Sequence, residues 1–350
     1  MAWVQRLHNH GVIDRAGAAL VPWWRGEGVD DVQETLRLWA IVDNWRSSHA
    51  YPLNSVQVNL RSRVARVAPG ALVVQRMKRF SSLMNKLARQ PRMSLSQMHD
   101  LGGCRAIFDD VAAIDEIVAL YRPRRQRDLF GGPDGPKCYD YIRKPKPDGY
   151  RGVHLVVRFV ARSSQRKLWN GQRIEIQLRS RLQHAFATAV ETVTTFTREP
   201  LKFGGGSEEW RGFFSLMGSV LALREGTPIV AGTSSDPEVL IEQLRAAEAK
   251  LRVRQRLRGW AAAIHVMPSQ NLDEPWLVLR LDLDRPTIQV AGYPDASRAA
   301  ASIAPTEQQP SSGIDAVVVK VNDLKTIRLA YPNYYADASA FLDALDAALQ

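Results

Sequence analysis

Residues 173–180, RIEIQLRS, alternate strictly between polar and apolar side chains. A period of two residues is the pattern of a β-strand that buries one face and leaves the other face open. The apolar set is Ile174, Ile176 and Leu178, and the polar set includes Glu175, Gln177 and Arg179. The chain is therefore expected to build a sheet that packs on one side and presents a carboxylate and a guanidinium on the other.

Apolar spacing and helix breakers predict an α/β chain, in an α+β arrangement, in which helices flank the sheet. Helices are expected at residues 30–48, 57–67, 71–89, 111–121, 183–197, 210–223, 238–258 and 338–349, and further strands at 104–108, 153–160, 260–267, 276–283, 287–293 and 315–321. Residues 225–237, EGTPIVAGTSSDP, are rich in Gly, Pro, Ser and Thr, which is typical of a linker. They predict two domains, at residues 1–228 and 229–350, of which the second is a small α+β unit.

The clearest helix pattern covers residues 71–89. Its apolar residues are spaced by four and three positions and form a stripe that would face the core: Val73, Met77, Phe80, Met84 and Leu87. A second stripe lies on another face, with Arg76 at its edge, and consists of Lys78, Ser82, Lys86 and Arg89. A buried helix with this stripe would present charge to phosphate groups, although a solvated basic face is an equally good interpretation of this segment alone.

The positive charge of the chain is concentrated in its middle. Residues 51–200 hold 27 Lys and Arg against 12 Asp and Glu, a net of +15, whereas residues 201–350 hold 15 against 18, a net of −3. A cationic region of this kind attracts phosphate-rich partners, nucleic acid among them. Charge alone does not distinguish tRNA from a small polyphosphate, and an ordinary solvated basic surface would have the same composition.

No run of about 18 apolar residues is present, so neither a membrane-spanning segment nor a membrane partner is expected. The first residues, MAWVQRLHNHGVID, are interrupted by charged and polar side chains and lack the apolar core of a signal peptide. Cys104 and Cys138 are the two cysteines of the chain, and they give no disulfide framework and no zinc spacing. A reducing, cytoplasmic location is the expectation.

Two carboxylates from separate predicted strands suggest a site for a magnesium nucleotide. Asp100 stands just before the strand at 104–108, close to two glycines, and Glu175 lies on the polar face of the alternating strand. Mg²⁺ prefers hard oxygen ligands and takes few of them from the protein when phosphate and water complete its shell. Each carboxylate taken singly is more often a surface group or a helix cap.

Residues 137–154, KCYDYIRKPKPDGYRGVH, combine cations, aromatic rings and a Pro-Asp-Gly turn. Tyr150 lies where the turn meets a strand and could stack on a nucleobase, while His154 could donate to a phosphate or a ribose. The alternatives are a tyrosine that packs on the core and a histidine whose hydrogen bonds are made within it.

Four segments resemble, in order and spacing, the RelA/SpoT-type nucleotide pyrophosphokinase domain: QRMKRFSSLMNKLAR, HDLGGCRAIF, YDYIRKPKPDGYRGVH and RIEIQLRSRLQHAFATAVE. The resemblance covers about residues 30–225. It implies a nucleotidyltransferase-like mixed β-sheet. It also implies an activity that uses Mg²⁺, moves the β,γ-pyrophosphate of ATP onto a ribose 3′-hydroxyl and releases AMP.

The resemblance further implies roles for individual residues. Asp100 and Glu175 would be catalytic and hold Mg²⁺, and Glu175 would also take the proton of the attacking hydroxyl. The ATP-binding set would be Arg76 and Arg105 around the adenine, with Lys78, Lys86 and Arg89 on the phosphates. The acceptor-binding set would be Lys144, Lys146, Tyr150, His154, Gln177 and Arg179, with Tyr150 stacked on the acceptor base.

The acceptor side departs from the usual pattern of the family. The usual NGYRSLH loop reads DGYRGVH here, so that Asp148 and Gly152 differ, and Phe186 stands where Trp is usual. These changes spare the metal and ATP positions and leave the identity of the acceptor open.

The segments VETVTTF and YPNYY resemble the fused toxin–antitoxin members of the family, the capsid-sensing phage-defence kind. This resemblance implies that the enzyme pyrophosphorylates the 3′-CCA end of tRNA and stops translation. It also implies that Tyr331 and Tyr334 occupy the ATP site as an autoinhibitory element until a phage protein, such as a capsid protein, binds the C-terminal domain. The alternative for these two tyrosines is a turn whose rings pack beneath the last helix.

Two other functions are compatible with parts of the pattern. One is an alarmone synthetase that uses ATP with GDP or GTP. The other is an inactive RNA-binding module, which the complete pair of Asp100 and Glu175 disfavours. The sequence leaves the assembly open, and a monomer is compatible with it.

Overall fold

The computed structural model describes residues 3–27, 31–121, 135–161, 163–201, 204–263, 265–266, 271, 273–282, 285, 287–307, 314–320 and 337–350. Its helices are α1 (His10–Trp24), α2 (Val32–Ser48), α3 (Ala50–Val67), α4 (Phe80–Arg89), α5 (Val111–Tyr121), α6 (Arg181–Thr197), α7 (Glu208–Arg224), α8 (Pro237–Leu251), α9 (Val253–Ala263), α10 (Ala296–Glu307) and α12 (Ser339–Leu349). Its strands are β1 (Leu72–Met77), β2 (Gly102–Phe108), β3 (Lys137–Asp140), β4 (Val153–Arg158), β5 (Arg173–Ser180), β6 (His265–Val266), β7 (Trp276–Asp282), β8 (Thr287–Tyr293) and β9 (Ile314–Lys320).

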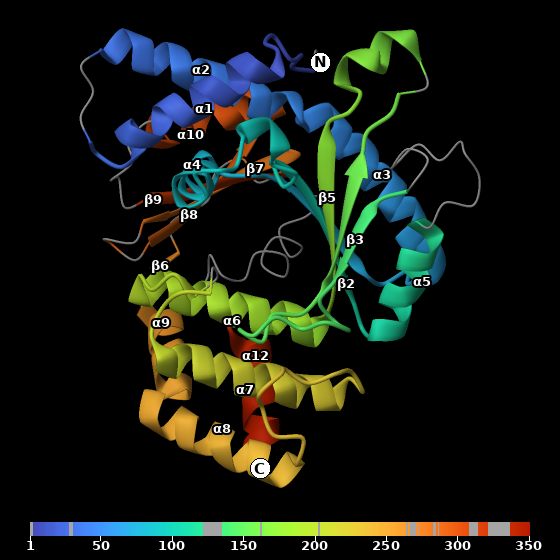
Figure 1. Cartoon of the computed structure of the whole chain (residues 1–350), viewed down its shortest axis with the longest axis vertical. Helices are drawn as coiled ribbons and strands as arrows, with labels where there is room; N and C mark the ends of the chain where they lie inside the picture. The colour runs from blue at the N-terminus through green and yellow to red at the C-terminus, as the bar shows by residue number, and fades with distance from the viewer. Residues whose placement is uncertain are drawn as a thin grey trace.

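Within the described residues the strands form one nine-stranded mixed sheet in the order β3-β4-β5-β2-β1-β9-β7-β8-β6. The pairs β2–β5 and β6–β8 are parallel, and the other pairs are antiparallel. Helices flank this sheet (Figure 1). The predicted fold class, a mixed sheet flanked by helices, is therefore confirmed.

One face of the part of the sheet formed by β4, β5, β2 and β1 is buried by α3 and α5. The apolar side chains of β5, which alternate as the sequence predicts, contribute Ile174, Ile176 and Leu178 to this core. From the helices come, among others, Leu53, Val56, Leu60, Ile114 and Ile117. The opposite face of β5 is thereby left for its polar side chains.

A second core lies among helices at the C-terminal end of the molecule (Figure 1). Helices α6 and α7 pack there against α8, α9 and α12, and Phe213, Phe214 and Phe341 are almost fully buried in it. Helix α6 begins directly where β5 ends, because the Ser180 hydroxyl accepts from the backbone N–H of Gln183 in a capping box.

The sheet continues across the predicted domain boundary. Strand β9 pairs with β1, with Arg76 in register with Val319, and β7 then pairs with β9. Helices from both sides of the boundary also share the second core. The division into residues 1–228 and 229–350 stays a prediction, and the two parts are joined by backbone hydrogen bonds.

The helix predicted at 71–89 is wrong in its first half. Residues 72–77 form strand β1, paired along its length with β2, and the helix begins only at Phe80. The apolar residues spaced by four and three positions lie partly in the strand and partly in the helix, so their helical spacing is a coincidence. The paired Val73 and Val74 are β-branched and suit a strand, and pairing with β2 overrides the local helical pattern.

Other boundaries differ for local reasons. Helix α3 begins at Ala50 and not at the predicted residue 57. It tolerates Pro52, because this residue lies in the first turn, where a missing N–H breaks no hydrogen bond. Residues 260–263, half of the strand expected at 260–267, are the end of α9, since alanine favours helix, and among the other described residues of this range 265–266 are strand. Helix α10 was not predicted, and its last residues, from 304 on, belong to a stretch that the sequence pattern indicated as a loop.

Candidate active site

The register of the sheet places the polar side chains of three strands on one face. Glu175 of β5 pairs with Gly103 of β2, which in turn pairs with Arg76 of β1. One row further along, Gln177 pairs with Arg105. Residues in register point to the same side of a sheet, so these side chains share a surface. Gly103 has no side chain and leaves space between the carboxylate and the guanidinium.

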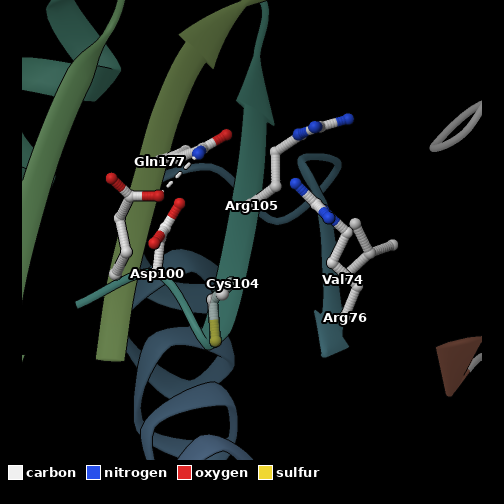
Figure 2. A pocket seen from close by; sticks show the side chains of 8 residues that line it. Val74, Arg76, Asp100, Cys104, Arg105 and Gln177 are labelled. Carbon is white, nitrogen blue, oxygen red and sulfur yellow. Dashed lines mark hydrogen bonds between the residues drawn. The ribbon is translucent and has the colours of Figure 1, made fainter. Parts of the chain in front are cut away.

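A pocket opens on this surface. Its lining consists of Val74, Arg76, Asp100, Gly103, Cys104, Arg105, Glu175 and Gln177. Figure 2 shows the Arg76 and Arg105 side chains extending toward the same space, with Asp100 and Gln177 among the other residues of the lining. The two arginines that the resemblance assigns to the adenine, and the two carboxylates that it assigns to the metal, thus line one pocket.

Asp100 is held between two ammonium groups. Its Oδ2 atom accepts from Lys78 Nζ at 2.7 Å and its Oδ1 atom from Lys86 Nζ at 3.0 Å. Burial raises the pKa of Asp100, but the charges of these two lysines outweigh burial and hold the pKa below its usual range. Burial lowers the pKa of Lys78 to about 8, against the opposing effect of the Asp100 carboxylate.

Glu175 belongs to a closed ring of five side chains. His154 Nδ1 donates to Glu175 Oε1 at 2.9 Å, and His154 Nε2 lies 2.6 Å from the Tyr150 hydroxyl. Arg179 donates to the same hydroxyl at 2.9 Å and to Gln177 Oε1 at 3.4 Å. Gln177 Nε2 donates to Glu175 Oε2 at 2.7 Å, which closes the ring. Each member orients the next, so the carboxylate is fixed before any ligand binds.

The ring changes the ionisation of its members. Burial raises the pKa of Glu175, but the hydrogen bond and the charge of His154 outweigh it and lower the pKa below the usual range. Burial lowers the pKa of His154, but Tyr150 and Glu175 outweigh it and raise the pKa to about 9. Burial raises the pKa of Tyr150, and the charges of Arg179 and His154 lower it to about 8. The face therefore carries a carboxylate beside a cationic imidazole at neutral pH.

The turn that carries Tyr150 is pressed against helix α7. Gly149 has φ +81°, and a Cβ there would lie 2.3 Å from the carbonyl oxygen of Phe214. A Cβ at Gly218 would in turn lie 2.7 Å from the Cα of Gly149. Only glycine fits at both positions of this contact. The packing of this turn against α7 therefore fixes the position of Tyr150 relative to the sheet.

Most of the predicted site residues converge, and a few lie elsewhere. Lys146 Nζ lies over the Tyr150 ring, 5.0 Å from its centre. Lys144 is exposed, and Arg89, the last residue of α4, is also exposed. The ion pairs of Asp100 are with Lys78 and Lys86. Tyr331 and Tyr334, the predicted autoinhibitory pair, lie outside the described residues.

The sequence interpretation missed Arg151 and three rings next to the site. Arg151 is 2% exposed, and its guanidinium donates to the carbonyl oxygens of Gly218 and Ile142, at 3.1 Å each. The rings are those of His99, Tyr139 and Tyr141. The signal was present in YDY, whose two tyrosines fall on one face of an extended chain.

The pair of carboxylates fits a magnesium ion that arrives with a nucleotide. Among the described residues no group of three or more His, Cys, Asp or Glu could hold a metal by itself. A carboxylate has about four acceptor positions, and the contacts above use two on Asp100 and two on Glu175. Each carboxylate therefore keeps a lone pair for Mg²⁺, whose other ligands would be phosphate and water.

No helix in the described part of the chain combines the length and the apolar character needed to cross a membrane.

Comparison with known proteins finds a family that part of this chain resembles. The family described as "Region found in RelA / SpoT proteins" matches residues 75–198. GTP pyrophosphokinase YwaC of Bacillus subtilis is 29% identical over 110 residues, which are 30% of this chain and 49% of that protein. The uncharacterized protein Rv1366 of Mycobacterium tuberculosis is 32% identical over 120 residues, which are 34% of this chain and 38% of that protein. The chain thus spans half or less of the length of these relatives.

Solved structures give a weaker likeness. Small alarmone synthetase 1 from Bacillus subtilis, bound to its product pppGpp, superposes with a TM-score of 0.39 at 18% identity, over 62% of this chain and 94% of that one. A GTP pyrophosphokinase family protein from Streptococcus pneumoniae superposes with a TM-score of 0.38 at 18% identity, over 62% of this chain and 92% of that one.

The matched segment begins in β1 and ends just after α6, so it contains the pocket lining apart from Val74, both carboxylates and the ring around Glu175. Residues 75–198 of this chain are therefore similar to the region found in RelA and SpoT proteins.

Proposed function

We propose that the chain is an ATP-dependent pyrophosphokinase that uses Mg²⁺ and transfers pyrophosphate to a ribose 3′-hydroxyl. The observation that carries the proposal is the position of Glu175. Its carboxylate lies between the cationic wall formed by Arg76 and Arg105 and the ring formed with His154 and Tyr150. A donor polyphosphate on one side and an acceptor nucleoside on the other would meet at this carboxylate.

The residues divide the chemistry between binding and proton transfer. Lys78, Lys86 and the arginines would neutralise the phosphates of ATP, and Mg²⁺, held by Asp100 and Glu175, would supply further positive charge there. The acceptor oxygen forms a bond to the β-phosphorus, the bond from that phosphorus to the oxygen of the α-phosphate breaks, and AMP leaves. Glu175 takes the proton of the attacking hydroxyl.

The low pKa of Glu175 makes it a weak base, which this chemistry tolerates. Phosphoryl transfer has a loose transition state, in which positioning and charge neutralisation contribute more than the strength of the base. His154, which donates to Glu175, holds the carboxylate in one orientation.

We place the 3′-CCA end of tRNA first as the acceptor. The net charge of +15 over residues 51–200 is compatible with a large polyanion. The changed Asp148 and Gly152 support an acceptor other than the usual one. The second candidate is GDP or GTP, which would make the protein an alarmone synthetase. The name of the relative YwaC, a GTP pyrophosphokinase, favours this candidate.

One assay tests the activity and distinguishes the acceptors. The full chain carrying Tyr334→Ala, a change that would lift the restraint proposed below, is incubated with γ-labelled ATP, Mg²⁺ and either deacylated tRNA, tRNA that lacks its terminal adenosine, or GDP. We expect label on intact tRNA, none on the truncated tRNA, and no label after Glu175→Gln. Label on GDP alone would establish the second candidate, and the absence of label from every acceptor would refute the activity.

We also propose that the C-terminal part restrains the enzyme until a phage protein binds it, as in a fused toxin–antitoxin of cytoplasmic anti-phage defence. Strand β9 supports this role, because it pairs with β1 beside Arg76, on the ATP side of the pocket. The residues assigned to the restraint by resemblance are Tyr331 and Tyr334. Two rings three positions apart could replace an adenine between two arginines through cation–π contacts.

Expression in bacteria tests the restraint. Tyr334→Ala should be toxic, and the double variant Tyr334→Ala with Glu175→Gln should be harmless, because the toxicity would need the active site. If the stable, soluble Tyr334→Ala protein has the same effect on growth as the unchanged chain, the restraint is not made by this tyrosine.

A further inference from the structure

Three aromatic rings form a row beside the acceptor side of the pocket. The rings of His99 and Tyr139 are 6.4 Å apart with planes 16° from parallel, and those of Tyr139 and Tyr141 are 6.3 Å apart with planes 10° from parallel. Tyr141 then meets the rings of Tyr150 and His154 edge-on, at 5.9 and 5.3 Å. The row therefore leads away from the Tyr150 position.

The row is attached to the sheet through its edge strand. Tyr139 of β3 pairs with His154 of β4, so both side chains share the face that carries Glu175. Tyr141 follows in a turn that the Asp140 carboxylate fixes by accepting from the backbone N–H groups of Ile142 and Arg143. The two tyrosines are only partly buried. They are thus rigidly positioned and open to a ligand.

Two lysines accompany the rings. Lys137 Nζ lies 5.0 Å from the centre of the Tyr139 ring, and Lys146 Nζ lies 4.5 Å from that of Tyr141. Lys137 is exposed, whereas Arg143 nearby is bound to Asp115 and Asp140. Aromatic rings that alternate with cations are the usual surface for single-stranded nucleic acid, in which bases stack and phosphates are neutralised.

We propose that His99, Tyr139 and Tyr141, with Lys137 and Lys146, form a stacking platform for the nucleotides that precede the reacting 3′ end of a single-stranded RNA. The proposal rests on the proposed function, since it takes Tyr150 as the position of the terminal nucleoside. A free guanine nucleotide ends at Tyr150 and leaves Tyr139 unused. The platform thereby selects a polynucleotide acceptor over a mononucleotide.

Binding measurements on the full chain test the platform without requiring catalysis. The probe is a short 5′-fluorescein-labelled RNA that ends in CCA-3′, and its Kd is measured by fluorescence anisotropy over a series of salt concentrations. Tyr139→Leu should raise the Kd about 5- to 150-fold, because a stacked base contributes about 1–3 kcal/mol. Tyr139→Phe, which keeps the ring, should stay within about 2-fold of the unchanged chain.

A lysine variant covers the case in which Tyr139→Leu does not fold. Lys137→Gln changes an exposed side chain, and it should lower the slope of log Kd against log salt by about one. Tyr139→Leu should leave that slope unchanged, since stacking releases no counterions. The affinity for GDP should be the same in all variants.

The opposite results would overturn the platform. They are no binding of the RNA to the unchanged chain, an equal Kd for Tyr139→Leu, or an equal loss of GDP binding. The labelled transfer assay distinguishes a failure of the platform from a failure of the proposed activity. Label on tRNA with normal RNA binding by Tyr139→Leu would refute the platform alone, whereas ring-dependent binding without any transfer would refute the activity alone.

Discussion

Arg151 and Gly218, which are 67 positions apart in the chain, join the turn that carries Tyr150 to helix α7 through a buried hydrogen bond of 3.1 Å. The same guanidinium also donates to Thr227 Oγ1 at 3.3 Å and to the carbonyl oxygen of Pro228. The Arg151 side chain, directly after Tyr150, is thus hydrogen-bonded both to α7 and to the start of the segment that leads to the C-terminal part. The turn that carries Tyr150, α7 and the first residues of that segment cannot move independently while these bonds hold.

Arg151→Met should destabilise the protein by roughly 2–5 kcal/mol, because each buried acceptor left without a donor costs about 1–3 kcal/mol. Urea denaturation measures the loss. Arg143→Met is the matched control, since the Arg143 side chain is 50% exposed and its surface ion pairs contribute about 0–1 kcal/mol. Equal losses in the two variants would show that the buried bonds of Arg151 carry no special weight.

Two glycines in α7 should respond to alanine with opposite signs. Gly212→Ala should stabilise the protein by about 1 kcal/mol, because a Cβ there meets no atom within 4 Å and alanine favours helix. Gly218→Ala should destabilise it and raise the KM for the acceptor, since its Cβ would displace Gly149 and with it Tyr150. Thermal denaturation and the transfer assay, with ATP varied separately, measure both effects. A stabilising Gly218→Ala would contradict the close contact.

Asp100→Asn should abolish transfer and yet strengthen the binding of ATP in the absence of metal. The carboxylate neutralises Lys78 and Lys86 in the free protein, so ATP phosphates must compete with it. Its removal should tighten metal-free ATP binding about 10-fold, as expected for charged hydrogen bonds of about 1.5–3 kcal/mol.

Titration of a fluorescent ATP analogue in EDTA measures this affinity. Asp109→Asn is the control, because the Asp109 side chain is 77% exposed and pairs with Arg181 outside the pocket. Weaker metal-free binding by Asp100→Asn would show that Asp100 supports ATP binding directly.

His49 should make the protein sensitive to mild acid. Burial lowers its pKa to about 4 from 6.5, against the opposing effect of backbone carbonyls, one of which, on Trp45, lies 2.8 Å from Nδ1. The unfolded chain takes up a proton below pH 6.5, whereas the folded chain does so only near pH 4. The free energy of unfolding should therefore fall as the pH drops through this window, by up to about 1.4 kcal/mol per pH unit.

The matched variant for this prediction is His49→Gln, which cannot titrate and can still donate to the Trp45 carbonyl. Urea denaturation at several pH values should show that the variant lacks part of the acid-induced loss of the unchanged chain. Parallel stability curves for the two proteins between pH 7 and pH 4 would contradict a neutral, buried His49.

The elements that the sequence predicted well are those whose pattern is local. Strand β5 coincides with the predicted segment 173–180, because its period of two residues records one buried and one open face. Strand β1 was predicted as helix, because nothing within 71–89 reveals the pairing with β2 that makes residues 72–77 extended. Lys78 and Lys86 still reach one carboxylate, although no single helix carries them.

The sequence by itself determined the chemical groups of this site and the resemblance that gives them roles: two carboxylates, a set of cations, and a tyrosine with a histidine four positions later. Only the tertiary structure decided how they meet. The register of β1, β2 and β5 places Arg76 opposite Glu175, the ring closes through Gln177, and α7 fixes the turn at Tyr150. These relations join residues far apart in the chain, and their energy comes from pairing and packing that no local pattern records.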